Sequence, residues 1–280
     1  MNRIIGDTTC SVPIKEGQKE GIIYLPQIII FGDESYRDDT EMDSEQFLSK
    51  LKSSHTLPKT AAPPPALYEP YFKEISEKGD TAIVICPSSD LSGTTRSATV
   101  AAEDYKDVDI RIIDTRTVAG GLGSIVLQAA KWAKDEMDSD TLVQKIREMA
   151  SRERVYFLVD TLEYLYKGGR IGGAQALMGS LLQVKPILTL VDGRANSAET
   201  QRTKKRAQAR LKELVLEDCP HSPEAHLSVS HCDAFEEAQA FAKDLAEALG
   251  VDNVPIYDLP PAIIVHAGPK TIAVSYFRQK

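Results

Sequence analysis

Apolar runs alternate with helical patterns along the first half of the chain. Continuous apolar or β-branched runs at 22–31, 81–86 and 108–113 are typical of buried strands. Apolar residues recur at helical spacing over 124–137 and 141–152. This order predicts an α/β fold with a parallel or mixed sheet and helices on both of its faces.

The second half combines paired strands with helices. Asp192-Gly193 separates two strand-like runs and predicts a hairpin with an Asp-Gly turn. Because this mixture differs from the first half, we expect a mixed α/β domain with antiparallel strands over 156–280, after an N-terminal α/β domain over 1–155. Further strands are predicted at 226–231, 254–259, 262–266 and 271–277, and helices at 202–216 and 234–250.

Composition and charge narrow the class of protein. The 280 residues are 42% hydrophobic and 26% charged, which suits a globular protein of two domains. The net charge of −8 argues against non-specific nucleic-acid binding. No apolar run approaches the roughly 18 residues of a membrane span, and the apolar start is too short for a signal peptide. We expect a cytoplasmic protein.

Four cysteines lie far apart in the sequence, at Cys10, Cys86, Cys219 and Cys232. An even number allows two disulfides, but reduced and packed cysteines suit a cytosolic chain better. None of the four forms a Cys-x-x-Cys pair, so no metal site is expected.

The segment around Arg170 is the first candidate for binding chemistry. A strand-like run from Val155 leads into a helical pattern that breaks at Gly168-Gly169. Paired glycines end a helix and let another part of the protein or a ligand approach the backbone closely. The planar guanidinium of Arg170 then suits a carboxylate or phosphate. A surface arginine after the end of a helix remains the alternative.

A second candidate follows the strand 81–86, where Ser92, Gly93 and Thr94 precede a helical run. The backbone N–H groups of a helix N-terminus bind anions without a cation. Simple helix capping by Ser92 is the alternative, although the number of hydroxyl residues in this turn exceeds what a cap needs.

Three further segments have more than one interpretation. The run from Asp7 to Ser11 follows a strand at 3–7 and suits either a ligand-facing loop or a capping turn. The proline-rich stretch 58–65 suits either a linker or an ordered loop, and we interpret it as a linker. A lone histidine is usually structural. His266, however, ends the predicted strand 262–266 beside a Gly-Pro turn, where it could contact a ligand and, beside an anion, be partly protonated near pH 7.

Several motifs resemble the signature of the DegV family of bacterial fatty-acid-binding proteins. They are Leu162-x-Tyr-Leu-x-Lys-Gly-Gly-Arg-Ile-Gly172, Leu181-Leu-x-Val-Lys-Pro-Ile-Leu188, Ser88-Ser-x-Leu-Ser-Gly-Thr94 and Ile263-x-x-His-x-Gly-Pro269. The resemblance extends over about 4–277.

This resemblance implies the DegV fold, with a long-chain fatty acid in an apolar tunnel between two domains. Its carboxylate would contact Thr60 and Ser92, with Arg170 and His266 nearby, and no cofactor is implied. The acid would be presented to a separate ATP-dependent fatty acid kinase and become an acyl phosphate. The chain departs from the family pattern at Ala61 and Ala62 beside Thr60, and at 64, 119 and 270.

Other functions fit the sequence less well. Ser92 and His266 could form the nucleophile and base of an esterase or thioesterase, but Gly-x-Ser-x-Gly is absent and no acid partner stands out. An autonomous kinase would need a phosphate-binding loop. A DNA-binding regulator would need a helix-turn-helix pattern and a basic field.

A basic run covers residues 202–206. Such a run is most often a solvated face. On an acidic protein, Arg202, Lys204 and Lys205 could instead dock an acidic partner or a membrane surface during ligand transfer.

Overall fold

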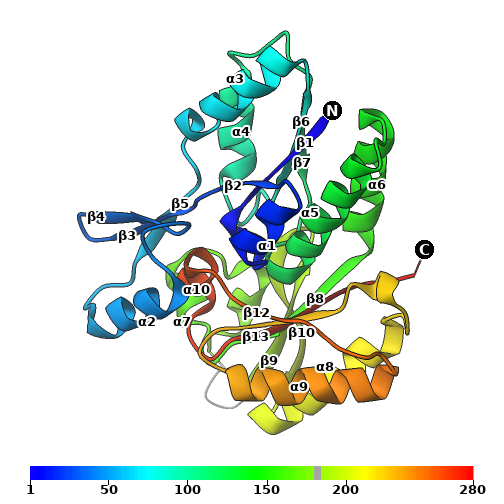
Figure 1. The fold of residues 1–280 in the computed structure, drawn as a ribbon. Coiled ribbons are helices and arrows are strands. Elements are labelled where there is room, and N and C mark those ends of the chain that lie inside the picture. The colour runs from blue at the N-terminus through cyan, green and yellow to red at the C-terminus, as the bar shows by residue number, and fades with distance from the viewer. Residues whose placement is uncertain (180–183, 280) are drawn as a thin grey trace.

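The computed structural model describes residues 1–179 and 184–279. Its N-terminal half holds a four-stranded sheet in the order β2-β1-β6-β7, and each neighbouring pair is parallel (Figure 1). Two segments of the sequence analysis lie partly outside the described residues. They are the apolar run after Gly173 and the motif that starts at Leu181. The strands are β1 (Asn2–Asp7), β2 (Ile23–Leu25), β6 (Thr81–Cys86) and β7 (Ile110–Asp114).

Helices cover both faces of this parallel sheet. Because successive side chains of a strand point to opposite faces, Ile4 packs in a core with α5 and α6, whereas Ile5 packs in another with α3 and α4. The arrangement confirms the predicted α/β organisation. The helices of this half are α1 (Ile14–Lys19), α2 (Ser44–Ser53), α3 (Glu69–Lys78), α4 (Thr94–Ala102), α5 (Ala119–Lys134) and α6 (Ser139–Arg152).

A small antiparallel sheet projects from the first half, in the order β4-β3-β5. Its strands are β3 (Ile28–Phe31), β4 (Glu34–Arg37) and β5 (Lys59–Ala61). The linker predicted over 58–65 is therefore wrong, because Thr60 pairs with Ile29 in this sheet. Strand β5 lies at the edge of its sheet, where nearby prolines are tolerated. The proline content of 58–65 alone therefore suggested a linker.

The second half is built on a six-stranded sheet in the order β10-β9-β8-β13-β11-β12. All neighbouring pairs are antiparallel except β11–β12, and the predicted Asp192-Gly193 hairpin joins β9 to β10. The strands are β8 (Glu153–Leu158), β9 (Lys185–Val191), β10 (Arg194–Gln201), β11 (Ser228–His231), β12 (Ile256–Asp258) and β13 (Ile272–Phe277).

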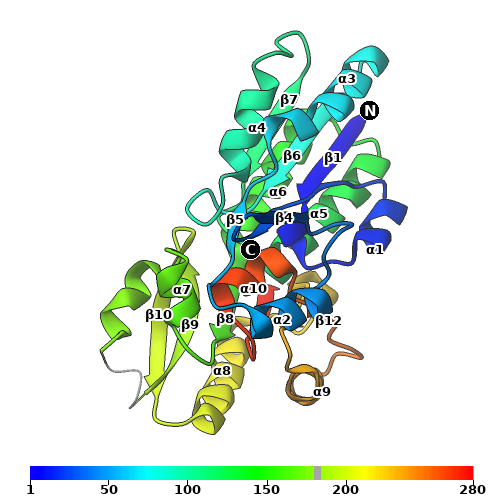
Figure 2. The same cartoon turned by 90° about the vertical axis from the view of Figure 1, so that its left-hand side faces the viewer.

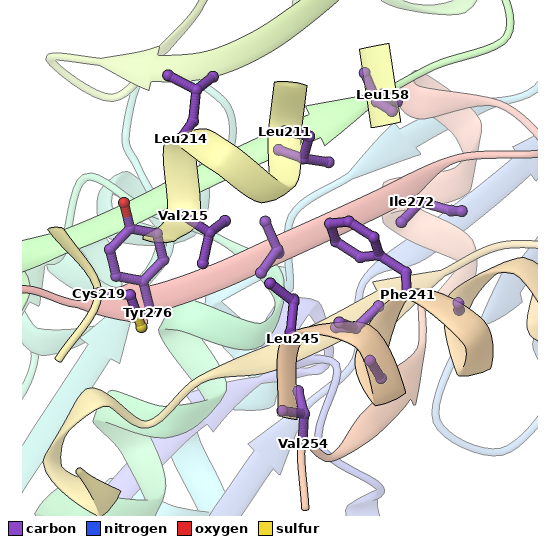
Figure 3. Packing of buried hydrophobic residues seen from close by; sticks show 14 of the residues in the cluster. Leu158, Leu211, Leu214, Val215, Cys219, Phe241, Leu245, Val254, Ile272 and Tyr276 are labelled. Carbon is purple, nitrogen blue, oxygen red and sulfur yellow. The ribbon is translucent and has the colours of Figure 1, made fainter. Parts of the chain in front are cut away.

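Two long helices bury one face of the six-stranded sheet. They are α8 (Lys204–Asp218) and α9 (Phe235–Leu249), and both were predicted. Leu211 of α8 and Leu245 of α9 pack with Ile272 of β13 in the core that Figure 3 shows. The last strand of the chain thus lies in the middle of the sheet. The domain boundary predicted near residue 155 falls inside strand β8, and this division into two domains stays a prediction.

The predicted strand 262–266 is wrong, because these residues form helix α10 (Pro261–Ala267). A short apolar run does not distinguish a strand from a buried helix. Pro261 occupies the first helical position, where a proline is favourable, and the helix buries Ile264 and Val265. Helix α10 lies where the two halves meet and contacts β5, α2 and α7 (Glu163–Lys167) (Figure 2).

Helix α5 begins five residues earlier than predicted and includes three glycines. Glycine weakens a helix, but a Cβ at Gly123 would lie 2.5 Å from the backbone oxygen of Cys10. The glycine therefore lets α5 pack directly on the short 3₁₀ turn Thr8–Cys10 that follows β1.

We expect Gly123→Ala to lower the free energy of unfolding by about 1–3 kcal/mol, because backbone atoms must move to accept the methyl group. Chemical denaturation measures the change. Ser124→Ala, at the next position of the same helix, is the control and should change stability by less than about 0.5 kcal/mol. A gain of about 1 kcal/mol in Gly123→Ala, as helix propensity alone would give, would contradict the close approach.

Candidate ligand-binding site between the two halves

A cavity of about 110 Å³ lies between the two halves of the protein. Most of its wall is apolar, and the polar side chains come from a few loop and helix positions. Thr60, Ser92, Arg170 and His266 all line it, so the structure brings together four of the six predicted ligand-binding residues. The apolar lining includes Leu91, Val118, Val155, Phe157, Leu165, Leu190, Leu259 and Ile263.

Thr60 and His266 meet across the junction of the halves. The Thr60 hydroxyl lies 2.9 Å from Nε2 of His266. Strand β5 supplies the threonine and helix α10 the histidine. Gly168 at the end of α7 makes room for the ring, because a Cβ there would overlap Nδ1 of His266. Of the two glycines, Gly168 thus permits the close approach that the sequence suggested, whereas Gly169 has open space at its Cβ position and a positive φ of 72°.

The His266 imidazole is neutral at pH 7. Burial, with the nearby charge of Arg170, lowers its pKa to about 4. The expected partial protonation of this histidine beside an anion stays a prediction. Its Nδ1 is buried and has no hydrogen-bond partner within the described part of the chain.

Arg170 is half-buried at the edge of the same cavity. Its Nε donates to the backbone oxygen of Leu91 at 3.0 Å, and Nη1 donates to that of Gly168 at 2.7 Å. Burial lowers its pKa from the usual value, but an arginine stays charged in proteins. No ion pair to this guanidinium forms within residues 1–179 and 184–279. A positive charge in a largely apolar wall is the feature that an anionic ligand would complement.

Ser92 lies just before helix α4, with Gly93 at the N-cap. Its hydroxyl accepts from the backbone N–H of Thr94 at 3.3 Å and lies 2.9 Å from the Thr94 hydroxyl. Gly93 and Thr94 do not line the cavity. Thr94 is buried next to Ser92. A Cβ at Gly93 would lie 3.4 Å from the Cβ of Ala62, which follows β5. These two predicted residues therefore support the site from outside it.

The sequence alone did not single out Gln27, which also lines the cavity. Its side chain is buried and donates to Asp7 Oδ2 at 2.7 Å and to Thr94 Oγ1 at 3.0 Å. The capping interpretation of the Asp7–Ser11 run is confirmed, because Asp7 caps the 3₁₀ turn. Thr9 lines the cavity, and the ligand-facing interpretation stays a prediction. The proline before Gln27, which splits residues 22–31 into two strands, was the available signal.

The β9–β10 hairpin forms one wall of the cavity through Leu190 and Ala195. Its turn is fastened to the first half, because Ser88 Oγ donates to the Gly193 oxygen at 2.8 Å. Arg194 pairs with Asp90 at 2.7 Å. The loop that carries Ser92 is thus tied to the hairpin that walls the cavity.

The arrangement does not build the hydrolase that was considered from the sequence. A general base must reach its nucleophile and be oriented by a third group. In the described residues, Ser92 bonds to Thr94, His266 bonds to Thr60, and no carboxylate reaches the free Nδ1 of His266. A pKa of about 4 also makes this histidine a poor base at neutral pH.

The basic run lies at the start of α8 and takes no part in the cavity wall. Lys204 pairs with Glu237 of α9 at 2.7 Å, whereas Arg202 and Lys205 are exposed. All four cysteines are free and buried, as predicted. In the described ranges, no group of three or more His, Cys, Asp or Glu could hold a metal ion. Nor does any helix in these ranges have the length and hydropathy needed to cross a membrane.

Comparison with known proteins gives one consistent result. The family model for an uncharacterised protein of the DegV family matches residues 1–279. A DegV domain-containing protein of Halalkalibacterium halodurans is 31% identical over 278 residues, which cover 99% of this chain and 98% of that protein.

Solved structures agree in fold over the whole chain. A fatty acid binding DegV family protein from Streptococcus agalactiae is similar with a TM-score of 0.91 at 26% identity, over 100% of this chain and 99% of that one. DegV of Bacillus subtilis, a fatty acid binding protein, gives 0.88 at 29% identity over 99% of both chains. The predicted fold is confirmed, and the chain belongs to the DegV family.

Proposed function

We propose that this protein binds a long-chain fatty acid in the cavity between its two halves. The observation that carries the proposal is the half-buried guanidinium of Arg170, which has no acidic partner within the described residues and lies in an otherwise apolar wall. Similar proteins from Streptococcus agalactiae and Bacillus subtilis are described as fatty acid binding, which supports the same ligand class here.

The head group would be held by polar side chains that come from both halves. The carboxylate would accept hydrogen bonds from the Thr60 and Ser92 hydroxyls, with Arg170 balancing its charge. Hydrogen bonds to a charged group contribute about 1.5–3 kcal/mol each. Neutral His266 holds the Thr60 hydroxyl at 2.9 Å and would orient it toward the ligand.

The tail would supply most of the affinity. Each buried methylene contributes about 0.8 kcal/mol, so ten of them would contribute about 8 kcal/mol. Such a chain is larger than the cavity of about 110 Å³. The cavity must therefore widen into a tunnel, and the wall formed by the β9–β10 hairpin is the part that we expect to move.

The bound acid would then serve a separate ATP-dependent fatty acid kinase, which would convert it to an acyl phosphate. Two features support this role. The chain resembles DegV proteins along its full length, and it carries no phosphate-binding loop of its own. Reduced cysteines favour a cytoplasmic location for this protein. Arg202 and Lys205 would face the kinase or, transiently, a membrane surface.

We expect Thr60→Ala and Ser92→Ala each to weaken fatty acid binding by about 10- to 100-fold, because each removes one hydrogen bond to the carboxylate. Isothermal titration with a monomeric fatty acid measures the affinity. Thr99→Ala is the matched control, since this exposed threonine lies on α4 away from the cavity. Unchanged affinity in both cavity variants, with the fold intact, would count against the head-group assignment.

Charge reversal tests whether Arg202 and Lys205, the exposed basic residues at the start of α8, form a docking face for the kinase. We expect the double variant Arg202→Glu, Lys205→Glu to slow phosphorylation of the bound acid by the partner kinase and to leave fatty acid affinity unchanged. Lys204 is left intact because it pairs with Glu237. Lys243→Glu, an exposed single reversal on α9, is the control for a charge reversal away from this face. A turnover rate equal to that of the control would remove Arg202 and Lys205 from the interface.

A further inference from the structure

A chain of hydrogen bonds runs from the cavity wall to a buried carboxyl group. Ser92 lines the cavity, and its hydroxyl lies 2.9 Å from the Thr94 hydroxyl. The Thr94 hydroxyl in turn lies 2.7 Å from Oδ2 of Asp7. Nothing in the proposed function uses Asp7, although this acid lies only one hydroxyl away from a proposed ligand contact.

Asp7 is completely buried at the end of β1 and has four hydrogen-bond partners. Oδ1 bonds to the N–H of Thr9 at 2.9 Å and to its hydroxyl, and Oδ2 bonds to Gln27 and Thr94. No cation forms an ion pair with it in residues 1–179 and 184–279. Its charge, when present, is balanced by neutral donors alone.

The Thr94 and Ser92 hydroxyls each have one proton to donate. The donor direction along this series of hydrogen bonds therefore depends on whether Asp7 is ionised or protonated. When Asp7 is ionised, the Thr94 hydroxyl must donate to it. Thr94 Oγ1 then accepts from Gln27 and from Ser92, so the only hydroxyl proton of Ser92 points away from the cavity. The Ser92 oxygen would present lone pairs to a ligand, which repel a carboxylate.

When Asp7 is protonated on Oδ2, every bond of the chain can reverse without losing a partner. Asp7 donates to Thr94 Oγ1, which still accepts from Gln27 and now donates to Ser92 Oγ. The Ser92 hydroxyl is then free to donate into the cavity. The same atoms at the same distances therefore give a donor or an acceptor at the cavity wall.

We propose that Asp7 is a positioning residue for the ligand, and that the relay Asp7–Thr94–Ser92 presents a donor to a carboxylate only when Asp7 carries a proton. The inference rests on the proposed binding of a fatty acid. It adds that a bound carboxylate retains or takes up one proton at Asp7, so that affinity falls as pH rises through the pKa of this group.

The surroundings of Asp7 favour its protonated form. Burial raises the pKa of Asp7 above its usual value, against the hydrogen bonds from Thr9, Thr94 and Gln27, which lower it. The titratable groups that interact with Asp7 are all acids. Burial also raises the pKa of Asp38 to about 7, and raises those of Cys10, Cys86 and Tyr68. Asp38 accepts from the backbone N–H of Gln27, and its ionisation adds repulsion that further opposes the ionisation of Asp7.

The test is the pH dependence of laurate binding, measured by isothermal titration from pH 6 to pH 9 below the micelle concentration. Across this range the free ligand is ionised and His266, with a pKa of about 4, is neutral. We expect wild-type affinity to fall by about tenfold or more, the loss of one hydrogen bond to a charged group. Asp7→Asn, whose amide donates permanently to Thr94, should bind with little change over the range.

Two variants of Thr94 separate the relay from simple charge repulsion. Thr94→Val leaves the charges of Asp7 and Asp38 in place but breaks the chain, so the pH dependence should be lost. Thr94→Ser keeps the hydroxyl and should restore it. A wild-type slope retained in Thr94→Val, or a flat wild-type profile, would overturn the relay. A wild-type protein that binds neither laurate nor a long-chain acid such as palmitate at any pH would instead refute the proposed function.

Discussion

A positive charge held in an apolar wall is the constraint on which the binding site depends. Arg170 is half-buried, and its only hydrogen bonds within the described residues go to two backbone carbonyl groups. Carbonyl dipoles balance a charge only in part, and a buried charge without a counterion is costly. An anionic head group would remove this cost, while the apolar remainder of the cavity would accept a tail. The two requirements together describe an amphipathic acid.

The fold keeps this charge beside the other polar groups by tying two differently built halves together. The parallel sheet of the first half ends in the loops that carry Asp7 and Ser92, as open α/β sheets place their ligand loops. The mostly antiparallel sheet of the second half supplies part of the apolar wall. Helix α10 closes the junction, and His266 can reach Thr60 because Gly168 leaves space for its ring. Small residues at contacts between elements therefore matter as much as the polar residues.

Much of the fold and part of the site could be predicted from the sequence. Ser92 and Arg170 were recognisable because local patterns, a strand before a serine-rich turn and a glycine pair before an arginine, have few structural meanings. The local patterns misled at β5 and α10, since a proline-rich edge strand and a short buried helix depend on neighbours distant in sequence. Gln27 and the protonation of His266 were beyond reach, because burial decides both. The assignment of Thr60 came from family resemblance rather than from its local pattern.

The most direct test of the central claim is mass spectrometry of an organic extract of the purified protein, compared with protein carrying Arg170→Gln. The account predicts that wild-type protein releases about one long-chain fatty acid per chain. The variant, which lacks the balancing charge, should release much less. A wild-type extract without any acyl ligand, from protein that also fails to take up added fatty acid, would contradict the account. Equal amounts from both proteins would remove Arg170 from its central place.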